Sequence, residues 1–223
     1  GVVSNYAGGG GGGIAAVDAL VIVSNGGRVA HCAAPDGGGI LLWNATGVFE
    51  RAVFSGNRAL LYGGGLFAYL TSVVVMSASR MEHNAAERSG GAVYLQRLPR
   101  TVQLGGCIVS NHAAIAAGAV YANDCADVRL GHACLAYNNA PSAGAALFDG
   151  CVTVRLDTVC IASNRAPEYG GIVIRACADY ELADCDVIGN VSLSGSYGVV
   201  YIEQSAGRVR TCDRVSDIRG NHA

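Results

Sequence analysis

The sequence predicts an all-β protein, a right-handed parallel β-helix of about eight coils with roughly 27 residues per coil. Three observations lead to this fold class. A short Asn motif recurs at near-constant spacing along the 223 residues. Each repeat contains three strand-like segments bounded by Gly, Asn and Ser. No stretch has the i, i+3, i+4, i+7 apolar spacing of an amphipathic helix.

The Asn motif consists of an apolar residue followed three positions later by Asn. Its nine Asn residues are Asn5, Asn25, Asn57, Asn84, Asn111, Asn138, Asn164, Asn190 and Asn221. An Asn side chain can donate to and accept from backbone groups at a turn, so we expect these residues to stack in a structural ladder, one in each coil. The apolar residues that precede them, from Phe54 to Val187, are expected to fill the interior.

Two further elements keep phase with the Asn motif. Small residues followed by apolar ones recur after most of the Asn residues, as in Gly64-Gly65 and Gly90-Gly91, and predict tight corners. Alternating runs such as Val102-Gln103-Leu104 recur every 26 residues and predict strands with one buried face. Because stacked strands lie about 4.8 Å apart, eight coils predict a rod roughly 40 Å long.

We expect residues 1–223 to form a single β-helix domain that is a segment of a longer protein. The intervals of 32 residues from Asn25 to Asn57 and of 31 residues from Asn190 to Asn221 indicate loop insertions near 28–50 and 213–217. The runs Gly8–Gly13 and Gly37–Gly39 do not fit the repeat, and the first of them is interpreted as a loop or tight turn.

Composition excludes several classes of protein. Charged residues make up only 14% and hydrophobic residues 51% of the chain, which excludes a disordered protein. The net charge of −2 offers no basic field for nucleic acid. No apolar stretch approaches the roughly 20 residues of a transmembrane helix, so no membrane span is expected in this segment.

The nine cysteines suggest two columns, with Cys107, Cys134, Cys160, Cys185 and Cys212 in one and Cys125, Cys151 and Cys177 in the other. One interpretation is stacked thiols that face the interior as small apolar residues. The other is disulfide bonds within coils, pairing Cys125 with Cys134, Cys151 with Cys160, and Cys177 with Cys185. Disulfides between stacked coils are disfavoured, because parallel rungs hold their Cβ atoms about 4.8 Å apart.

Candidate chemistry is sparse in this sequence. The densest acidic cluster is Asp179, Glu181, Asp184 and Asp186, which we interpret as a solvated face. The histidines share no spacing and no zinc pattern occurs, so we expect no catalytic residue, no metal site and no cofactor. Asn44-Ala45-Thr46 is a possible N-glycosylation site in a secreted protein.

The segment Phe54-Ser-Gly-Asn57, followed by Gly63-Gly-Gly-Leu-Phe67, resembles the repeat of the chlamydial polymorphic membrane proteins, which is marked by paired FxxN and GGA[ILV] motifs. Ser89-Gly-Gly-Ala-Val93 matches the second motif. Similar repeats occur in large surface proteins of algae and other protists. The resemblance implies a surface-exposed adhesin or passenger region.

Together these features predict a non-catalytic structural or adhesive segment of a large extracellular or cell-surface protein. Its expected partners are further coils or domains of the same polypeptide, other surface or filament proteins, or glycans. One alternative is a carbohydrate-active enzyme, a polysaccharide lyase or hydrolase, on the same fold; another is an intracellular scaffold. Three carboxylates converging with an Arg on one face would favour the enzyme, whereas a flat face of Thr, Ser, Gln and Tyr would favour binding.

Overall fold

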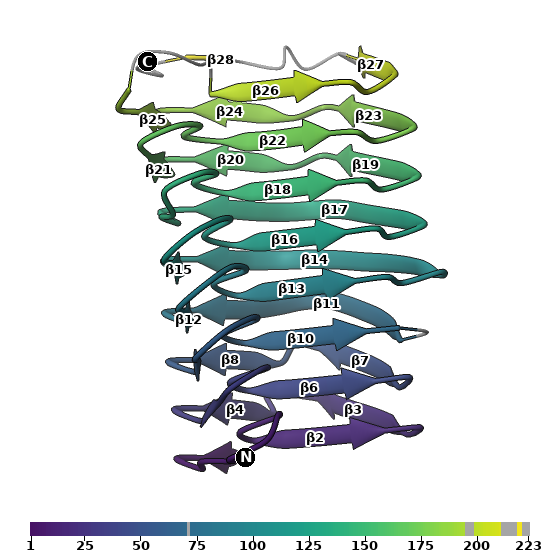
Figure 1. Cartoon of the computed structure of the whole chain (residues 1–223), viewed down its shortest axis with the longest axis vertical. Coiled ribbons are helices and arrows are strands. Elements are labelled where there is room, and N and C mark those ends of the chain that lie inside the picture. The colour runs from purple at the N-terminus through teal and green to yellow at the C-terminus, as the bar shows by residue number, and fades with distance from the viewer. Residues whose placement is uncertain (71, 195–198, 211–217, 220–223) are drawn as a thin grey trace.

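The computed structural model describes residues 1–70, 72–194, 199–210 and 218–219, and these form short β-strands joined by turns, without a helix. Strands pair in parallel with the equivalent strands of the adjacent coils, as Ile40 pairs with Leu66 and Leu66 with Val93. Figure 1 shows the coils stacked from the N-terminal end at the bottom to the C-terminal end at the top. An eight-stranded sheet with one strand per coil confirms the predicted parallel β-helix of about eight coils.

One face of the helix is this eight-stranded sheet. Its strands are β2 (Ile14–Val17), β6 (Ile40–Trp43), β10 (Leu66–Tyr69), β13 (Val93–Gln96), β16 (Val120–Asn123), β18 (Ala146–Asp149), β22 (Ile172–Arg175) and β26 (Val200–Glu203).

The rest of each coil is formed mainly by a fourteen-stranded sheet that bends at a corner. Its first limb contains β3 (Leu20–Ser24), β7 (Thr46–Glu50), β19 (Thr153–Asp157), β23 (Asp179–Ala183) and β27 (Gly207–Arg210). Its second limb contains β1 (Val2–Val3), β4 (Arg28–Ala30), β8 (Val53–Ser55), β20 (Cys160–Ala162), β24 (Asp186–Ile188) and β28 (Ile218–Arg219). Three long strands cross the corner, namely β11 (Val73–Glu82), β14 (Thr101–Val109) and β17 (Asp127–Ala136).

Two-residue strands close the coil before it returns to the eight-stranded sheet. They are β5 (Ala33–Ala34), β9 (Arg58–Ala59), β12 (Ala85–Ala86), β15 (His112–Ala113), β21 (Arg165–Ala166) and β25 (Val191–Ser192). Their second residue faces inward and is Ala in five of the six, since little room remains in this narrow edge of the coil.

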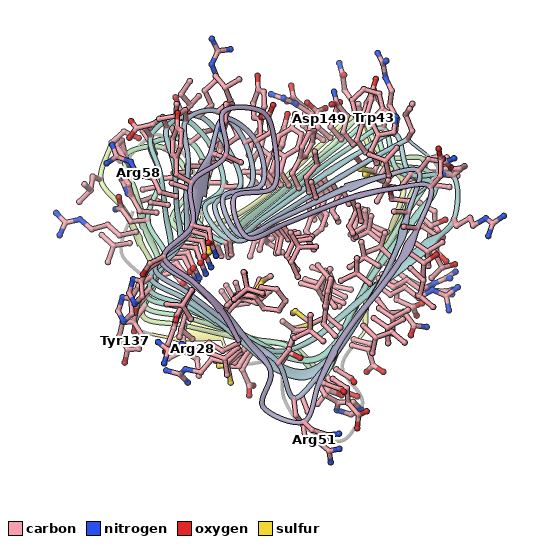
Figure 2. All side chains as sticks on the ribbon, turned by 90° about the horizontal axis from the view of Figure 1, so that it is seen from below. Arg28, Trp43, Arg51, Arg58, Tyr137 and Asp149 are labelled. Carbon is pink, nitrogen blue, oxygen red and sulfur yellow. The ribbon has the colours of Figure 1, made fainter. Side chains whose placement is uncertain are left out.

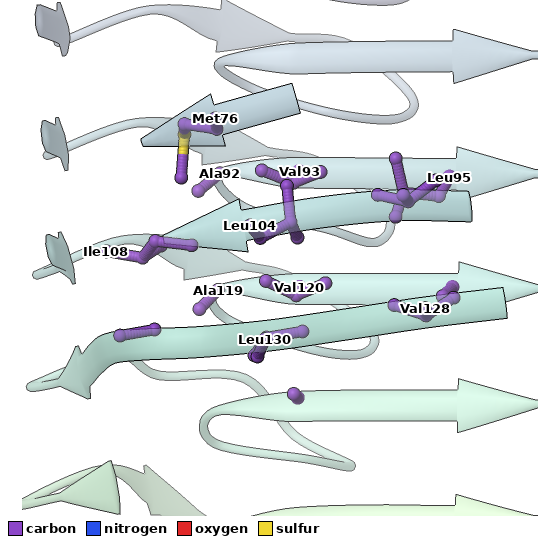
Figure 3. Packing of buried hydrophobic residues seen from close by; sticks show 14 of the residues in the cluster. Met76, Ala92, Val93, Leu95, Leu104, Ile108, Ala119, Val120, Val128 and Leu130 are labelled. Atoms are coloured by element: carbon purple, nitrogen blue, oxygen red, sulfur yellow. The ribbon is translucent and has the colours of Figure 1, made fainter. Parts of the chain in front are cut away.

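The core follows from strand alternation, in which every second side chain points inward. Val93 and Leu95 of β13 are fully buried and face Leu104 and Ile108 of the opposite sheet. Figure 3 shows the aliphatic side chains of successive coils stacked in this way between the two sheets. The interior is therefore a set of columns in which each residue packs on its equivalents above and below.

Six of the predicted Asn residues form a continuous buried ladder: Asn57, Asn84, Asn111, Asn138, Asn164 and Asn190. Each rung repeats one pattern. The Asn84 side-chain Nδ2 donates to Asn111 Oδ1 at 3.1 Å and to the Phe54 carbonyl at 3.0 Å, and the Asn84 backbone N–H donates to the same Oδ1 at 2.9 Å. The ladder thus satisfies backbone groups at a corner that no strand pairing reaches.

At the N-terminal end the ladder departs from the prediction, and Asn25 is not a rung. The register pairs Val29 with Val2 and with Phe54, so the rung between Asn5 and Asn57 is Cys32. The Cys32 backbone N–H donates to Asn57 Oδ1 at 3.0 Å, and Asn5 Nδ2 lies 4.0 Å from the Cys32 sulfur.

Asn25 instead occupies the corner between β3 and β4, where its φ is 53° and its Oδ1 accepts from Arg51. Asn is favoured at such left-handed corners, which explains the false match. The loop insertion expected near 28–50 is also absent, because strands β4 to β7 run through this range in register. Asn221 and residues 213–217 lie outside the described residues.

The glycine-rich runs turn out to belong to the repeat. The Gly12 N–H donates to the Gly37 carbonyl and the Gly38 N–H donates to the Gly63 carbonyl, so both runs are copies of one corner. At Gly64 an added Cβ would lie 2.3 Å from the Gly91 carbonyl oxygen of the next coil, which leaves no room for a side chain. Glycine is therefore required here by the close approach of stacked backbones.

Candidate functional site

The outer side of the eight-stranded sheet carries a cluster of aromatic side chains in its N-terminal half. Strand alternation places the second and fourth residues of each strand on this side. We call the cluster the aromatic face, and it consists of Trp43, Tyr62, Phe67, Tyr69, Tyr94 and Tyr121. These residues come from four consecutive coils, so the face exists only because the coils stack in register.

The rings of the aromatic face contact one another in a chain. Trp43 meets Tyr69 edge-on with ring centroids 5.3 Å apart, and Phe67 and Tyr94 lie 5.4 Å apart. Tyr94 in turn lies 5.0 Å from Tyr121. Such spacings are typical of favourable aromatic pairs. Trp43 remains 45% exposed, while Phe67 and Tyr94 are buried beneath their neighbours, so the face is rigid at its centre and accessible at its Trp43 edge.

Polar groups border the aromatic face. Arg88 lies over the Tyr62 ring, 5.9 Å from its centroid, and donates to the Tyr62 hydroxyl at 3.3 Å. Asp36 has one carboxylate oxygen that is buried without a hydrogen-bond partner. Burial raises the pKa of Asp36, against the lowering effect of the Tyr62 backbone N–H. Burial also raises the pKa of Tyr94, which keeps its hydroxyl neutral.

The outward column formed by the fourth residue of each strand becomes charged toward the C-terminus. Register places Trp43 and Tyr69 in one column with Asp149, Arg175 and Glu203. Figure 2, viewed along the axis, shows Trp43 and Asp149 on the same side of the coil. Arg175 forms an ion pair with Asp149, and its Nε lies 3.3 Å from Oδ1. The aromatic character is thus confined to the N-terminal coils of this column.

The cysteines divide between the interior and the surface. Cys125, Cys151 and Cys177 form one column, as predicted, and all three are buried at the corner after the eight-stranded sheet. The Cys177 thiol donates to the Arg175 carbonyl at 3.3 Å, a contact that Ser205 Oγ repeats one coil later with Glu203. These thiols therefore act as small core residues that satisfy strand-end carbonyls.

The second predicted column contains only Cys107, Cys134 and Cys160, which are half-buried and face outward. The next residue in register is Asp186, not Cys185. Cys185 is buried one position earlier, and its thiol donates to the Ala183 carbonyl at 3.3 Å. Cys212 lies outside the described residues.

The predicted disulfides within coils are wrong. Cys125 precedes β17 and faces the core, whereas Cys134 lies near the far end of that strand and faces outward. Nine residues of extended chain at about 3.3 Å each separate them by far more than the about 7 Å that a disulfide tolerates. The pair Cys151–Cys160 fails for the same reason. Cys177 and Cys185 are both buried, but eight residues of extended chain keep them apart, and all eight cysteines in the described part of the chain are free.

The remaining candidate residues do not assemble a reaction centre. Glu181 of the acidic cluster lies between Arg155 and Arg208, with N–O distances of 3.7 and 3.4 Å, while Asp186 lies on the second limb beyond the corner. Within the residues described, no group of three or more His, Cys, Asp or Glu is placed to hold a metal ion. Asn44 is exposed and donates to Asp18, so its sequon is accessible. A second sequon, Asn190-Val191-Ser192, is not, because Asn190 is fully buried.

Comparisons with known proteins add no family assignment. No protein-family model matches the chain, and no curated protein or solved structure matches it either. In the described part of the chain no helix is long and apolar enough to cross a membrane.

Sequence reasoning did not find the aromatic face, although its signal was present. Phe67, Tyr94 and Tyr121 follow one another at 27-residue steps within the small-residue motif, and Trp43 precedes Tyr69 by 26 residues. The residue after each inward position points outward by strand alternation, and aligning these outward residues from coil to coil would have shown the aromatic face.

Proposed function

We propose that this chain is a non-catalytic adhesive segment of an extracellular or cell-surface protein, a stiff β-helix rod that binds glycans through its aromatic face. The observation that carries the proposal is the chain of ring contacts from Trp43 to Tyr121, which is exposed at its Trp43 edge. Tyr and Trp offer a large apolar surface together with a polar handle, which suits the C–H faces and hydroxyls of a sugar ring. Gln96 and Asn123 continue the outer column with amide donors and acceptors.

Two further features support an extracellular or surface location. The Asn44 sequon is exposed at a corner, where an attached glycan would not disturb the core. The repeat resembles that of the chlamydial polymorphic membrane proteins in both of its motifs. Further coils or domains of the same polypeptide, and other surface or filament proteins, are the remaining partners of this proposal.

A glycan array with the purified chain tests the proposal. We expect binding to a subset of neutral glycans that is lost in the double variant Trp43→Ala/Tyr69→Ala. Arg175→Ala, at the charged end of the same column, is the matched control and should bind as the wild type does. Release of reducing ends or unsaturated products from a bound polysaccharide would favour the enzyme instead, and equal binding by all three proteins would exclude the aromatic face.

A further inference from the structure

Three cysteines on the outer side of the second limb form a feature that the proposed function does not use. Cys107, Cys134 and Cys160, which we call the thiol ladder, pair in register in three consecutive coils. The inward residues that follow them, Ile108 and its equivalents, are fully buried, so alternation directs the thiols outward.

The thiol ladder lines a surface groove of about 590 Å³ together with His132, Asp184 and Asp186. Gly106 and Ala133, which precede two of the cysteines, contribute almost no side chain to this groove. In the register, Cys134 lies between Cys107 and Cys160. The ladder therefore presents sulfur atoms to a site that a small solute can reach.

The distance between stacked coils determines whether these thiols are better placed to form a disulfide or to bind a metal ion. A disulfide requires Cβ atoms about 3.5–4.5 Å apart, closer than the about 4.8 Å repeat of stacked strands. With metal–sulfur bonds of about 2.3 Å, as in zinc thiolates, two sulfur atoms on opposite sides of an ion lie about 4.6 Å apart, which is close to the repeat of the stacked strands. Thiolate ligands select soft ions such as Cu(I).

We propose that the thiol ladder binds one soft d¹⁰ ion, of the Cu(I) class, in linear coordination between Cys134 and either Cys107 or Cys160. Each of the two thiols loses its proton, and each thiolate sulfur donates an electron pair to the ion, so binding releases two protons and changes no oxidation state. With a monovalent ion the two thiolates leave one net negative charge. Arg80, the next residue in the same outward column, lies beside the site and is ion-paired with Glu82.

Acidic groups lie beside the thiol ladder. Asp184, Asp186 and His132 line the same groove, and the two carboxylates there favour a cation. An ion that binds must displace the protons of the two thiols that become its ligands.

The chain contains a matched control for this proposal. Cys125, Cys151 and Cys177 have the same number of thiols, also in register, but they lie in the core. The two columns thus differ in exposure and not in spacing. Because Cys134 is the middle rung, its removal leaves two thiols about 9.6 Å apart, too far for one ion to bridge.

The test uses Ag(I), a redox-inert ion with the same linear preference, added to the reduced chain and followed by calorimetry and native mass spectrometry. We expect one tightly bound ion. Cys134→Ser should lower the affinity by more than about 100-fold, beyond the loss typical of an outer-shell partner. Cys107→Ser and Cys160→Ser should each retain binding, and the double variant should lose it. Cys151→Ser should bind as the wild type does.

Several results would overturn the proposal. Unchanged Ag(I) affinity in Cys134→Ser would place the ion elsewhere, and loss of binding in Cys151→Ser would place it in the core. Zn(II) binding as tight as that of Ag(I) would contradict linear two-sulfur coordination. Should a variant fail to fold, iodoacetamide mapping of the wild type replaces it, since bound Ag(I) is expected to protect Cys134 and one neighbouring rung from alkylation while leaving the core column unchanged.

Discussion

The N-terminal and C-terminal coils share one interior but present different outer surfaces. In the outer column of the eight-stranded sheet, Val17, Trp43 and Tyr69 give way to Asp149 and Arg175. The outer column of the first limb changes in the same sense, from Ile22, Val48 and Val75 to Arg155, Glu181 and Arg208. The inward columns remain apolar throughout.

This difference shows that stacking of the coils restricts the choice of residue only at the inward and corner positions. An outward residue contacts little beyond its neighbours in the coils above and below, so its column can change character within two or three coils. An inward residue must fill a fixed volume, and a corner residue must satisfy fixed backbone groups. Function in this chain is therefore expected to lie in the outer columns, and stability in the inner ones.

The largest effect is expected from breaking the Asn ladder, and it should be equal in both halves. Asn84→Ala removes the acceptor for the Asn57 N–H and the donor to the Phe54 carbonyl, and Asn164→Ala does the same for Asn138 and Leu135. Each orphaned buried group costs about 1–3 kcal/mol, so each variant should lose about 3 kcal/mol or more. Urea denaturation measures the loss.

The control for this comparison is Asn25→Gly, since Asn25 is exposed, lies outside the ladder and has a φ of 53° that glycine adopts without strain. Its free energy of unfolding should change by less than about 0.5 kcal/mol. A large loss in only one of the two ladder variants would show that the halves do not share one interior.

The second effect concerns the glycine corner. In Gly64→Ala the new Cβ would lie 2.3 Å from the Gly91 carbonyl oxygen, and in Gly144→Ala it would lie 2.2 Å from that of Gly170. Both substitutions should cost about 1–3 kcal/mol, because the stacked backbones must separate. Thermal unfolding followed by circular dichroism measures it. Gly131→Ala, where a Cβ meets nothing within 4 Å, serves as the control and should unfold close to the wild-type temperature.

The third effect is a difference in salt dependence between the stability costs of substitutions on the two outer surfaces. Trp43→Ala loses an edge-on aromatic contact and should cost about 0.5–1.5 kcal/mol at any salt concentration. Arg175→Ala loses a partly exposed ion pair and should cost about 0.2–1 kcal/mol, with the cost vanishing in 1 M NaCl because screening is then about 3 Å in range. Denaturation at two salt concentrations distinguishes them, and a salt-sensitive Trp43→Ala would contradict this assignment.

The smallest effect is a pH dependence of opposite sign in the two halves. Burial raises the pKa of Asp36, so its folded carboxyl binds protons more readily than the unfolded one, and stability falls as pH rises through the unfolded and then the folded pKa. Asp36→Asn should therefore be slightly more stable than the wild type at pH 7 and equal to it at pH 3.

Asp127 behaves in the opposite way. Burial opposes its charge, but hydrogen bonds from Arg129 and Thr101 outweigh burial and lower the pKa of this carboxyl. Its contribution is present above the unfolded pKa and is lost as pH falls through the folded pKa. Asp127→Asn should be slightly less stable at pH 7, by well under about 1 kcal/mol for so exposed a pair. Urea midpoints at the two pH values measure both variants, and a common sign would contradict the assignment.

The fold could be predicted because stacked coils need the same kinds of residue at the same positions in every coil. Asn57 to Asn190 stand at positions where backbone groups need a side-chain partner, so their period reveals the coil. Asn25 misled the prediction because a left-handed corner also favours Asn, and Cys32, which holds the true rung, breaks the motif. The period of the sequence thus predicts the length of the coil more reliably than it predicts which residue forms each rung of the ladder.

The candidate sites were harder to predict because they depend on which side of a strand a residue faces. Cys134 and Cys125 lie nine residues apart in sequence but face opposite sides of the sheet, which spacing alone does not show. A bulge between Leu104 and Gly106 shifts the register within β14, so simple alternation cannot be carried through the corner. The aromatic face was missed because the repeat was followed through its inward and corner residues, while the rings recur at outward positions of the same period.

The in-register pairing of each coil with its immediate neighbours has a mechanical consequence. The strand partners of a residue are about one coil away in sequence, so a force applied to the two ends is resisted by one coil interface at a time. Pulled in a force microscope, such a chain yields in a series of near-equal steps, each releasing one coil of about 27 residues, or about 90 Å of extended chain. The molecule would thus lengthen in steps under load, and the outer surface of every coil that has not yet unfolded would keep its shape.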